Sequence, residues 1–486
     1  MGRRARRPGS FVSCEQGVFR LHRLLDVGIW LSAGLLFMMF YPGGMSIDSY
    51  TQLAEARVGD FGDWHPPFMA WLWRGAETVR PGPLPMLLAQ FGLFLGGLWL
   101  FARPAFAGRK TALRVFVLLT LWVMPISGIV GVIWKDVWTS CLLLAGAALV
   151  WSFAQAERAA VRWTALLLAA VAMLGALLFR HNAVFAVVPL LVFAGWQQER
   201  PLLRRAVAAL AIGLLGSAIL MVAAGALNRA LTDKREFPVQ SILIYDLAGV
   251  AVRTGRTDLL QVAADQIPDV LRGQPGVSIE ALRSHYYPST WTPLAFVEGS
   301  PLAVTASAAQ VQALTALWRR AVLEEPRAYL RHRAAVFAQV IGAYRGPLFA
   351  PLYFGVPADS PDHAEISRRF RLDAGQLSPV QQRLREAFAS AAKRTLYRPW
   401  VWLILNVVAV IVAALFSSRR AALIALGSSG LCYELALFFI APSADYRYSH
   451  WLVLSTWAVL AALAWEFAAR RFGAGRFRKD CETPAG

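Results

Sequence analysis

The sequence predicts an all-α polytopic membrane protein with about ten transmembrane helices and one large, mainly helical domain outside the membrane. Three observations support this prediction. Of the 486 residues, 57% are hydrophobic and only 16% are charged, so the chain carries more apolar surface than one soluble core can bury. Apolar runs recur along the chain, and a single long polar segment interrupts them. The bilayer must therefore be part of the solvent.

The apolar runs define the expected spans. A helix crosses a bilayer with about 20 mostly apolar residues. The first run follows a basic start and has no small-residue cleavage site after it, which predicts an uncleaved signal anchor. The spans are expected near residues 24 to 41, 83 to 102, 113 to 134, 137 to 154, 163 to 179, 182 to 197, 205 to 227, 399 to 416, 421 to 440 and 449 to 468.

Basic residues predict the orientation of these spans. The formal net charge is +19, but the arginines and lysines form short clusters in alternate loops rather than one basic face, which argues against a nucleic-acid partner. By the positive-inside rule these loops and both termini are cytoplasmic. The short basic loops and compact length favour the bacterial inner membrane. The clusters contain Arg103, Arg109, Lys110 and Arg114; Arg158 and Arg162; Arg200, Arg204 and Arg205; Arg419 and Arg420; and Arg470, Arg471, Arg476, Arg478 and Lys479.

The same pattern predicts the domain organisation. Residues 1–227 form an N-terminal transmembrane module of about seven spans, with a first extracytoplasmic loop at 42–82. Residues 228–398 form the extracytoplasmic domain. Residues 399–470 form a C-terminal module of about three spans, and 471–486 a basic cytoplasmic tail. The segment 329–344 is short and carries Arg331, His332 and Arg333, which favours an interfacial amphipathic helix over a span.

Polar residues outside the basic clusters converge on the extracytoplasmic side of this topology. Asp48 and Gln52 have the four-residue spacing that places two side chains on one face of a helix. Each group also has a structural explanation: Asp48 as a helix cap, Lys135 with Asp136 as an ion pair, Arg180 as a snorkelling side chain, and Arg447 as a partner of Asp445. The group comprises Asp48, Gln52, Asp63, His65, Lys135, Asp136, Arg180, His181, Asn182, Asp445, Arg447 and Tyr448.

Arginines and lysines on this side run against the charge bias of the rest of the chain, so a compensating ligand is expected. An anionic ligand such as phosphate fits, since arginine offers bidentate contacts and lysine a point charge. Carboxylates in the same cavity would supply either a general base for a hydroxyl or oxygen ligands for a divalent cation. The combination suits transfer from a phosphate-linked lipid.

The stretches YPGGMSIDSYTQ and FGDWHPPFMAWLW resemble the first extracytoplasmic loop of the GT-C superfamily, membrane glycosyltransferases that use polyprenyl-phosphate-linked sugars. Asp48 matches the acidic residue that follows the first span in that family, and Asp136 in VIWKDVW matches the acidic residue of the next outer loop. The segments FRHNAVFAVVPLL and DYRY are similar to segments of related bacterial proteins. The resemblance covers most of the chain outside 228–398.

This resemblance implies an inverting transfer to an acceptor of the cell envelope, which is a glycan, a lipid or a protein. Asp48 would be the general base. Lys135, Arg180 and Arg447 would bind the donor phosphate, and Asp136 would hold a metal ion or orient a basic partner. A divalent cation, Mg²⁺ or Mn²⁺, would have Asp48, Asp136 and His65 as its candidate ligands.

The remaining polar residues receive the role of positioning the substrates: Gln52, Asp63, His65, His181, Asn182, Asp445 and Tyr448. Membrane lipids are the other expected partners. Two different functions compete with this prediction. One is a transporter or flippase of a lipid-linked or anionic substrate, which should place ionisable residues near the membrane midplane. The other is a polymerase or ligase of envelope polysaccharides that relies on arginines in outer loops.

Overall fold

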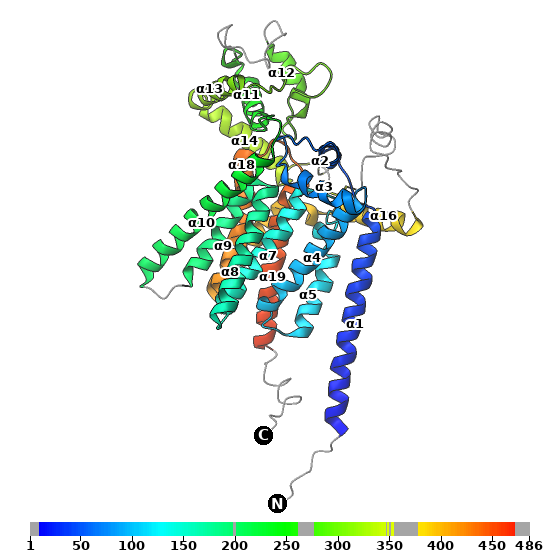
Figure 1. Ribbon diagram of the computed structural model, residues 1–486. Coiled ribbons are helices and arrows are strands. Elements are labelled where there is room, and N and C mark those ends of the chain that lie inside the picture. Colours follow the sequence, from blue (N-terminus) through cyan, green and yellow to red (C-terminus); the bar gives the residue numbers. More distant parts are fainter. Residues whose placement is uncertain are drawn as a thin grey trace, which may run out of the picture.

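The computed structural model describes residues 9–197, 201–260, 277–346, 348, 351–353 and 378–471, and these ranges fold into helices joined by turns and isolated β-bridges, without a strand. A bundle of long helices carries a smaller group of helices, the head, at one end (Figure 1). We call this end of the bundle the head end and the opposite end the basic end. The predicted all-α polytopic fold is confirmed.

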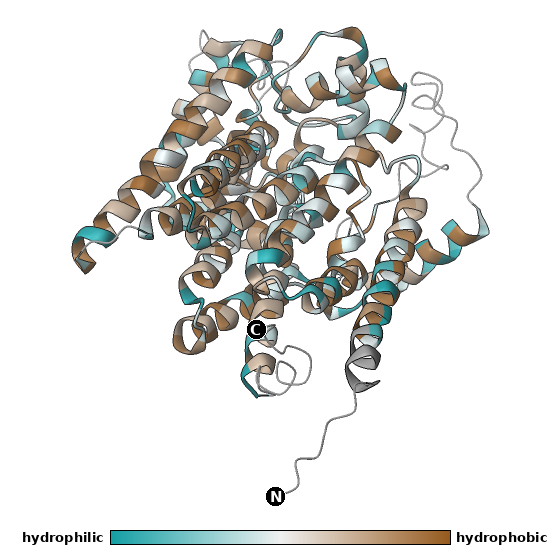
Figure 2. Cartoon of the chain, turned by 60° about the horizontal axis from the view of Figure 1, so that its bottom comes forward, coloured by the Kyte–Doolittle hydropathy of each residue, from teal (hydrophilic) through white to brown (hydrophobic). Residues whose placement is uncertain are grey.

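Within the described ranges, eight helices are long and apolar enough to cross a membrane. Hydrophobic residues dominate the bundle in Figure 2. α7 is the most enclosed, with 72% of its apolar window buried, whereas α10 lies at the edge with 17%. The eight are α1 (Gly9–Phe40), α4 (Leu84–Ala105), α7 (Lys135–Gln155), α8 (Ala159–Phe179), α10 (Leu202–Leu231), α17 (Pro399–Phe416), α18 (Arg420–Ile440) and α19 (His450–Arg471), the last extended by the short η6 (Tyr446–Ser449).

The other two predicted spans are shorter helices that pack in the same bundle. α9 (Val184–Trp196) follows the turn η1 (His181–Ala183) and forms a single apolar helix of intermediate length with it. The predicted span at 113–134 is α5 (Lys110–Trp122), which ends twelve residues early and is followed by the single turn α6 (Met124–Ser127). Pro125 has no N–H to continue the helix. The rest of this segment lies at the head end, where the Gly44 N–H donates to the Gly131 carbonyl and the Ile133 N–H donates to the Gly44 carbonyl.

The head has a hydrophobic core of its own, formed by α11 (Gln240–Thr254), α12 (Ile279–His285), α13 (Ala308–Glu324) and α14 (Pro326–Val340). α14 corresponds to the segment predicted as an interfacial helix, and that prediction is wrong. His332 and Arg333 are fully buried, because both contact the Asp246 carboxylate of α11. A helix lying in a membrane surface would instead turn these charges to water.

Three further helices lie at the head end of the bundle: α2 (Ile47–Val58), α3 (Phe68–Val79) and α16 (Pro379–Ala392). α16 lies beside the end of α1. Gln381 Nε2 donates to the carbonyls of Met38 and Tyr41, and Arg385 donates to that of Met39. These carbonyls belong to the end of α1 and have no partner within that helix. The contact therefore fixes the start of the first loop, which leads into α2.

Candidate functional site

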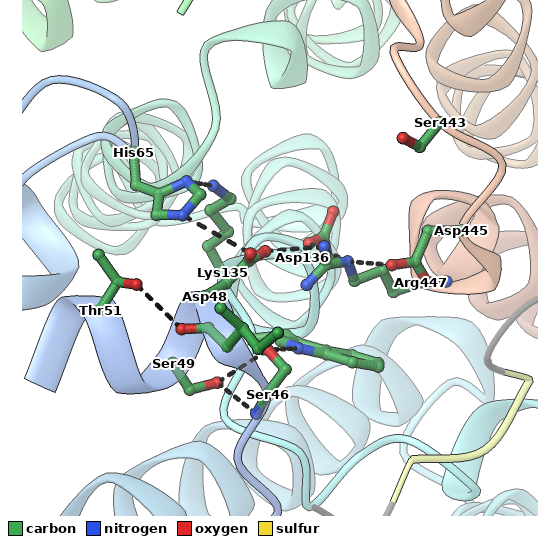
Figure 3. A network of polar contacts seen from close by, with 12 residues as sticks. Ser46, Asp48, Ser49, Thr51, His65, Lys135, Asp136, Ser443, Asp445 and Arg447 are labelled. Atoms are coloured by element: carbon green, nitrogen blue, oxygen red, sulfur yellow. Dashed lines mark hydrogen bonds and ion pairs between the residues drawn. The ribbon is translucent and has the colours of Figure 1, made fainter. Parts of the chain in front are cut away.

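Charged side chains from four segments meet in one cluster at the head end (Figure 3). The segments are the first turn of α2, the loop before α3, the first turn of α7 and the loop before α19, with Arg180 added from the turn after α8. The members of this charge cluster are Asp48, His65, Lys135, Asp136, Arg180, Asp445, Arg447 and Tyr448. The sequence named all eight.

Arg447 lies at the centre of the charge cluster. Its Nη2 is 2.8 Å from Asp48 Oδ2, and its Nε is 2.8 Å from Asp445 Oδ2 and 3.7 Å from Asp136 Oδ2. One guanidinium thus faces three carboxylates, which come from the first turn of α2, the first turn of α7 and the loop before α19. Since a guanidinium cannot lose its proton in a protein, its charge holds these carboxylates together.

Asp136 and Asp48 differ in their access to solvent. The side chain of Asp136 is 1% exposed and also forms an ion pair with Arg180, whereas that of Asp48 is 29% exposed. Arg180 lies over the ring of Tyr448, with its Cζ 4.7 Å from the ring centroid. Asp136 is therefore an internal anchor for two arginines, and Asp48 is the carboxylate that a substrate can reach.

His65 connects Lys135 to Asp48. Lys135 Nζ is 2.5 Å from His65 Nδ1, and His65 Nε2 is 3.7 Å from Asp48 Oδ1. When Lys135 is an ammonium group it only donates hydrogen bonds; Nδ1 then accepts, and the ring proton lies on Nε2, on the side of Asp48. Burial and the nearby Lys135 charge lower the pKa of His65 to about 3. The ring is therefore neutral at physiological pH.

The cations around Asp48 determine its ionisation. Burial alone would favour the neutral acid, but the charges of Arg447 and Lys135 hold the pKa of Asp48 far below its usual range. Asp445 behaves differently, because burial outweighs Arg447 and raises the pKa of its carboxyl. Asp48 is thus a carboxylate at every physiological pH, and it becomes a stronger base if a ligand draws Arg447 away.

Aromatic and hydroxyl side chains pack against the charge cluster. Trp134 lies under Arg447, with the guanidinium 4.7 Å from its ring, and its Nε1 donates to Ser46 Oγ at 2.7 Å. Ser46 caps α2 through a reciprocal pair with Ser49. Tyr353 packs against Trp134 at 5.4 Å between ring centroids. Sequence reasoning missed Ser46 and Trp134, although a serine two residues before Asp48 is a helix-cap signal.

The loop that carries Asp445 and Arg447 is fastened to the head. Arg333 Nη1 donates to the Ala441 carbonyl at 2.9 Å, and the backbone N–H groups of Trp291 and Ala444 bond to Pro442 and Ser289. Arg333 is itself held by Asp246 at 2.7 Å. The head therefore takes part in placing the charge cluster, although it supplies none of its charged groups.

Four predicted positioning residues lie outside the cluster. Asp63 accepts from the backbone N–H groups of Glu236 and Phe237, so it joins the first loop to the start of the head. Gln52 is buried and donates to the Asp48 carbonyl. His181 lies 3.0 Å from Asn228 Nδ2, and Asn182 bonds to the side chain of Tyr433. These contacts are structural, and a role in substrate binding stays a prediction for all four.

Glu55 is a residue that sequence reasoning missed. It follows Asp48 by seven residues on α2, a spacing that places both on one face of the helix. Its Oε1 accepts from the Gly62 N–H at 3.3 Å, and an added side chain at Gly62 would collide with Glu236 and Glu55. Burial raises the pKa of Glu55 to about 7, and the neighbouring Glu236 adds to the effect.

The predicted cation ligands do not converge on one point. Among the described residues no three His, Cys, Asp or Glu side chains are arranged to hold a metal ion. Asp48 and Asp136 both face Arg447, and the Nδ1 of His65 is taken by Lys135. Binding Mg²⁺ or Mn²⁺ here would require these ion pairs to separate.

Comparisons with known proteins identify no family. No family model matches the chain, and no curated protein matches it. Among solved structures, the chain is similar to an Archaeoglobus fulgidus oligosaccharyltransferase tethered to an acceptor peptide that contains the NVT sequon, with a TM-score of 0.39 and 12% identity. The match covers 95% of this chain and 52% of the archaeal chain, so the chain spans about half the length of that enzyme. The functional argument therefore rests on the site.

Proposed function

We propose that this protein is a membrane glycosyltransferase of the GT-C type, which moves a sugar from a polyprenyl-phosphate lipid to a cell-envelope acceptor. The reaction takes place at the head end. The members of the basic clusters that the structure describes lie at the other end, and the positive-inside rule then makes the head end extracytoplasmic and both termini cytoplasmic. We propose the bacterial plasma membrane as the location.

One observation carries this proposal: an accessible carboxylate lies within one cluster of cations at the mouth of a membrane bundle. Asp48 is the accessible carboxylate, and Lys135, Arg180 and Arg447 are the cations. A phosphate on a lipid anchored in the bilayer arrives at this depth, and a soluble acceptor reaches the same point from the head side. Asp48 contacts Arg447 directly in the free protein, so Arg447 must turn to the phosphate before the base and the phosphate-binding groups can lie on either side of one sugar.

The geometry supports a single displacement at the anomeric carbon. The acceptor hydroxyl gives its proton to Asp48, its oxygen forms the new bond to the anomeric carbon, and the bond from that carbon to the phosphate oxygen breaks. The electron pair leaves with the phosphate, whose charge Lys135, Arg180 and Arg447 stabilise. Attack from the face opposite the phosphate inverts the anomeric configuration.

Arg447 links donor binding to the activation of the base. In the free protein its charge is shared by Asp48 and Asp445. The donor phosphodiester, a monoanion that gains a second charge as the sugar leaves, competes for the same N–H groups, and arginine prefers bidentate contacts with phosphate. Once Arg447 turns to the phosphate, the pKa of Asp48 rises towards its usual range, which makes Asp48 a better proton acceptor.

The test is sugar transfer in proteoliposomes from a panel of polyprenyl-phosphate sugars to envelope extracts. Asp48→Asn should lower turnover by about 10²- to 10⁴-fold, the usual contribution of a general base. The matched control is Asp60→Asn in the same loop, whose carboxylate pairs with Lys234 outside the cluster and whose loss should leave turnover unchanged.

Three results would contradict the proposal. Equal turnover by folded Asp48→Asn and wild-type protein would remove Asp48 as the base. Translocation of a lipid-linked or anionic solute by wild-type protein, without transfer from any donor, would favour the transporter. Extension of an envelope polysaccharide that survives Asp48→Asn would favour the polymerase or ligase.

A further inference from the structure

A groove separates α9 from α18 at the basic end of the bundle, far from the charge cluster. Its volume is about 410 Å³, which lies within the range of small-molecule binding sites. It lies within the apolar segments of both helices, so a ligand must enter from the lipid phase. The lining residues are Val188, Pro189, Val192, Phe193, Trp196, Arg420, Ala421, Ile424, Ala425 and Ser428.

The groove exists because the two facing helix surfaces do not fit together along their whole length. The lining residues of each helix have the same spacing, with offsets of 1, 4, 5 and 8 from the first residue, which places them on one face of the helix. Towards the head end the helices touch, and Ser429 Oγ donates to the Ala186 carbonyl at 2.7 Å. Towards the basic end α18 offers small side chains, Ala421, Ala425 and Ser428, which leave the space open.

Close packing of α9 on α10 holds α9 beside the groove. An added Cβ at Gly213 of α10 would collide with the side chain of Val192, which also lines the groove, and one at Gly195 would lie 2.9 Å from Ala209 Cα. α9 and α10 are therefore packed at the closest approach that glycine allows. Moving α9 onto α18 would disturb this contact.

The mouth of the groove is positively charged. Arg420 is part of the lining and is exposed. Trp196 lines the same end of the groove. Arg205 contacts it, with Cζ 4.5 Å from the Trp196 ring and Nε donating to the Trp196 carbonyl. Glu466, which reaches the turn before α18, is already bound by Ser417, Ser418 and Arg470.

We propose that this groove binds an anionic phospholipid of the leaflet at the basic end. An acyl chain fills the space between α9 and α18, and the headgroup phosphate contacts Arg420 and Arg205. Basic pockets between transmembrane helices are typical sites for anionic headgroups. The bound chain completes the contact between the α9–α10 pair and α18, and so stabilises the helix that leads to Arg447. The proposal is independent of the reaction at the head end.

The experiment uses the full-length protein in a neutral detergent and native mass spectrometry with phosphatidylglycerol and phosphatidylcholine of equal chain length. Wild-type protein should retain phosphatidylglycerol preferentially. Arg420→Ala should lower that retention about fivefold, the effect of one basic residue at a lipid headgroup. The matched control is Arg158→Ala, an exposed arginine at the same end of the bundle and outside the groove, which should change nothing.

A second variant tests the groove itself. Ala425→Phe fills the space between the helices and should lower retention of both lipids, while elution and thermal unfolding without lipid show that the protein is folded. Equal retention of the two lipids by wild-type protein, or an equal effect of Arg158→Ala, would overturn the proposal. A protein dimer that Ala425→Phe dissociates would assign the groove to a second copy of the chain instead.

Discussion

Arg447 and Asp48 form an ion pair that must partly separate during the proposed reaction. The pair spans 2.8 Å, and Asp445 holds the other side of the guanidinium. A donor phosphate therefore competes with a carboxylate for the cation that binds it. This competition costs donor affinity in the free enzyme, and it couples donor binding to the release of Asp48 as a base.

Removing the charge of Asp48 should therefore strengthen phosphate binding. In Asp48→Asn, the affinity for a sugar-free polyprenyl phosphate should rise about tenfold, or about 1.4 kcal/mol. Calorimetric titration of wild-type and variant protein with the same lipid measures the difference. Asp60→Asn removes an equal charge outside the cluster and should leave the affinity unchanged. Weaker binding by Asp48→Asn would mean that Asp48 itself helps to hold the lipid.

A second prediction at this scale concerns metal removal. Because Arg447 faces Asp48 and Asp136, and Arg180 pairs with Asp136, the carboxylates already have cationic partners. Transfer should therefore keep its rate in EDTA. The measurement is turnover in proteoliposomes after chelation, with Mg²⁺ and Mn²⁺ added back. A rate that falls in EDTA and returns with one metal would show that the ion pairs open to form a cation site.

Glu55 predicts a pH dependence of stability. Its pKa is raised to about 7 in the folded protein from 4.5, so the carboxyl is neutral below this pH and ionised above it. A raised acid pKa contributes stability that is fully present below the unfolded pKa and is lost as pH rises from the unfolded to the folded pKa. The melting temperature should therefore fall by about 2 °C as the pH rises from about 5 to about 7, and should level off above that.

Glu55→Gln should flatten this part of the profile, because the amide does not ionise. Scanning thermal unfolding of both proteins from pH 5 to 9 provides the comparison. Glu77→Gln is the control, since Glu77 lies on α3 in an ion pair with Arg57. If that part of the wild-type profile is already flat, then Glu55 is ionised in the folded protein and its burial does not control its pKa.

At the scale of elements, the position of the loop between α18 and α19 depends on its contacts with the head. Arg333 of α14 donates to Ala441, and Asp246 of α11 orients Arg333. The loop continues to Asp445 and Arg447. A small displacement of catalytic groups is costly, since about 1 Å can reduce a rate a hundredfold.

Arg333→Lys should therefore lower kcat. Lysine keeps a positive charge beside Asp246 but loses the planar fork that reaches Ala441. We expect kcat to fall about tenfold or more, with the fraction of folded protein measured in parallel. Arg320→Lys on α13, an exposed arginine that pairs with Glu324, is the control and should retain wild-type kcat. A loss of activity that matches the loss of folded protein would reduce Arg333 to a stability role.

Elements also show what the sequence could and could not predict. The positions of the long helices follow from hydropathy, and Asp48, Lys135, Asp136, Arg180 and Arg447 follow from their common side of the membrane. The early end of α5 was readable in Pro125, but the surrounding apolar residues outweighed it in a span-length window. The burial of Arg333 was not readable, because its partner Asp246 lies 87 residues away and no local pattern marks it.

At the scale of the whole molecule, polar groups are separated by end. The charge cluster and the head occupy one end, and the arginine clusters of the described short loops occupy the other. The contacts within the bundle show which residues share an end, but only the distribution of basic residues predicts which end faces the cytoplasm. The orientation of the bundle in the membrane therefore decides whether the charge cluster can meet an extracytoplasmic lipid-linked donor.

The orientation can be measured by labelling single cysteines in a variant that lacks Cys14, Cys141, Cys432 and Cys481. Ser284→Cys is exposed on α12 of the head, and Glu157→Cys is exposed in the loop between α7 and α8. A membrane-impermeant maleimide should label Ser284→Cys in intact cells, and Glu157→Cys only after the membrane is opened. The reverse pattern would place Asp48 on the cytoplasmic side. Donor binding would then have to occur at the cytoplasmic leaflet, and the outward-facing reaction proposed for this protein would be wrong even if every contact in the charge cluster is correct.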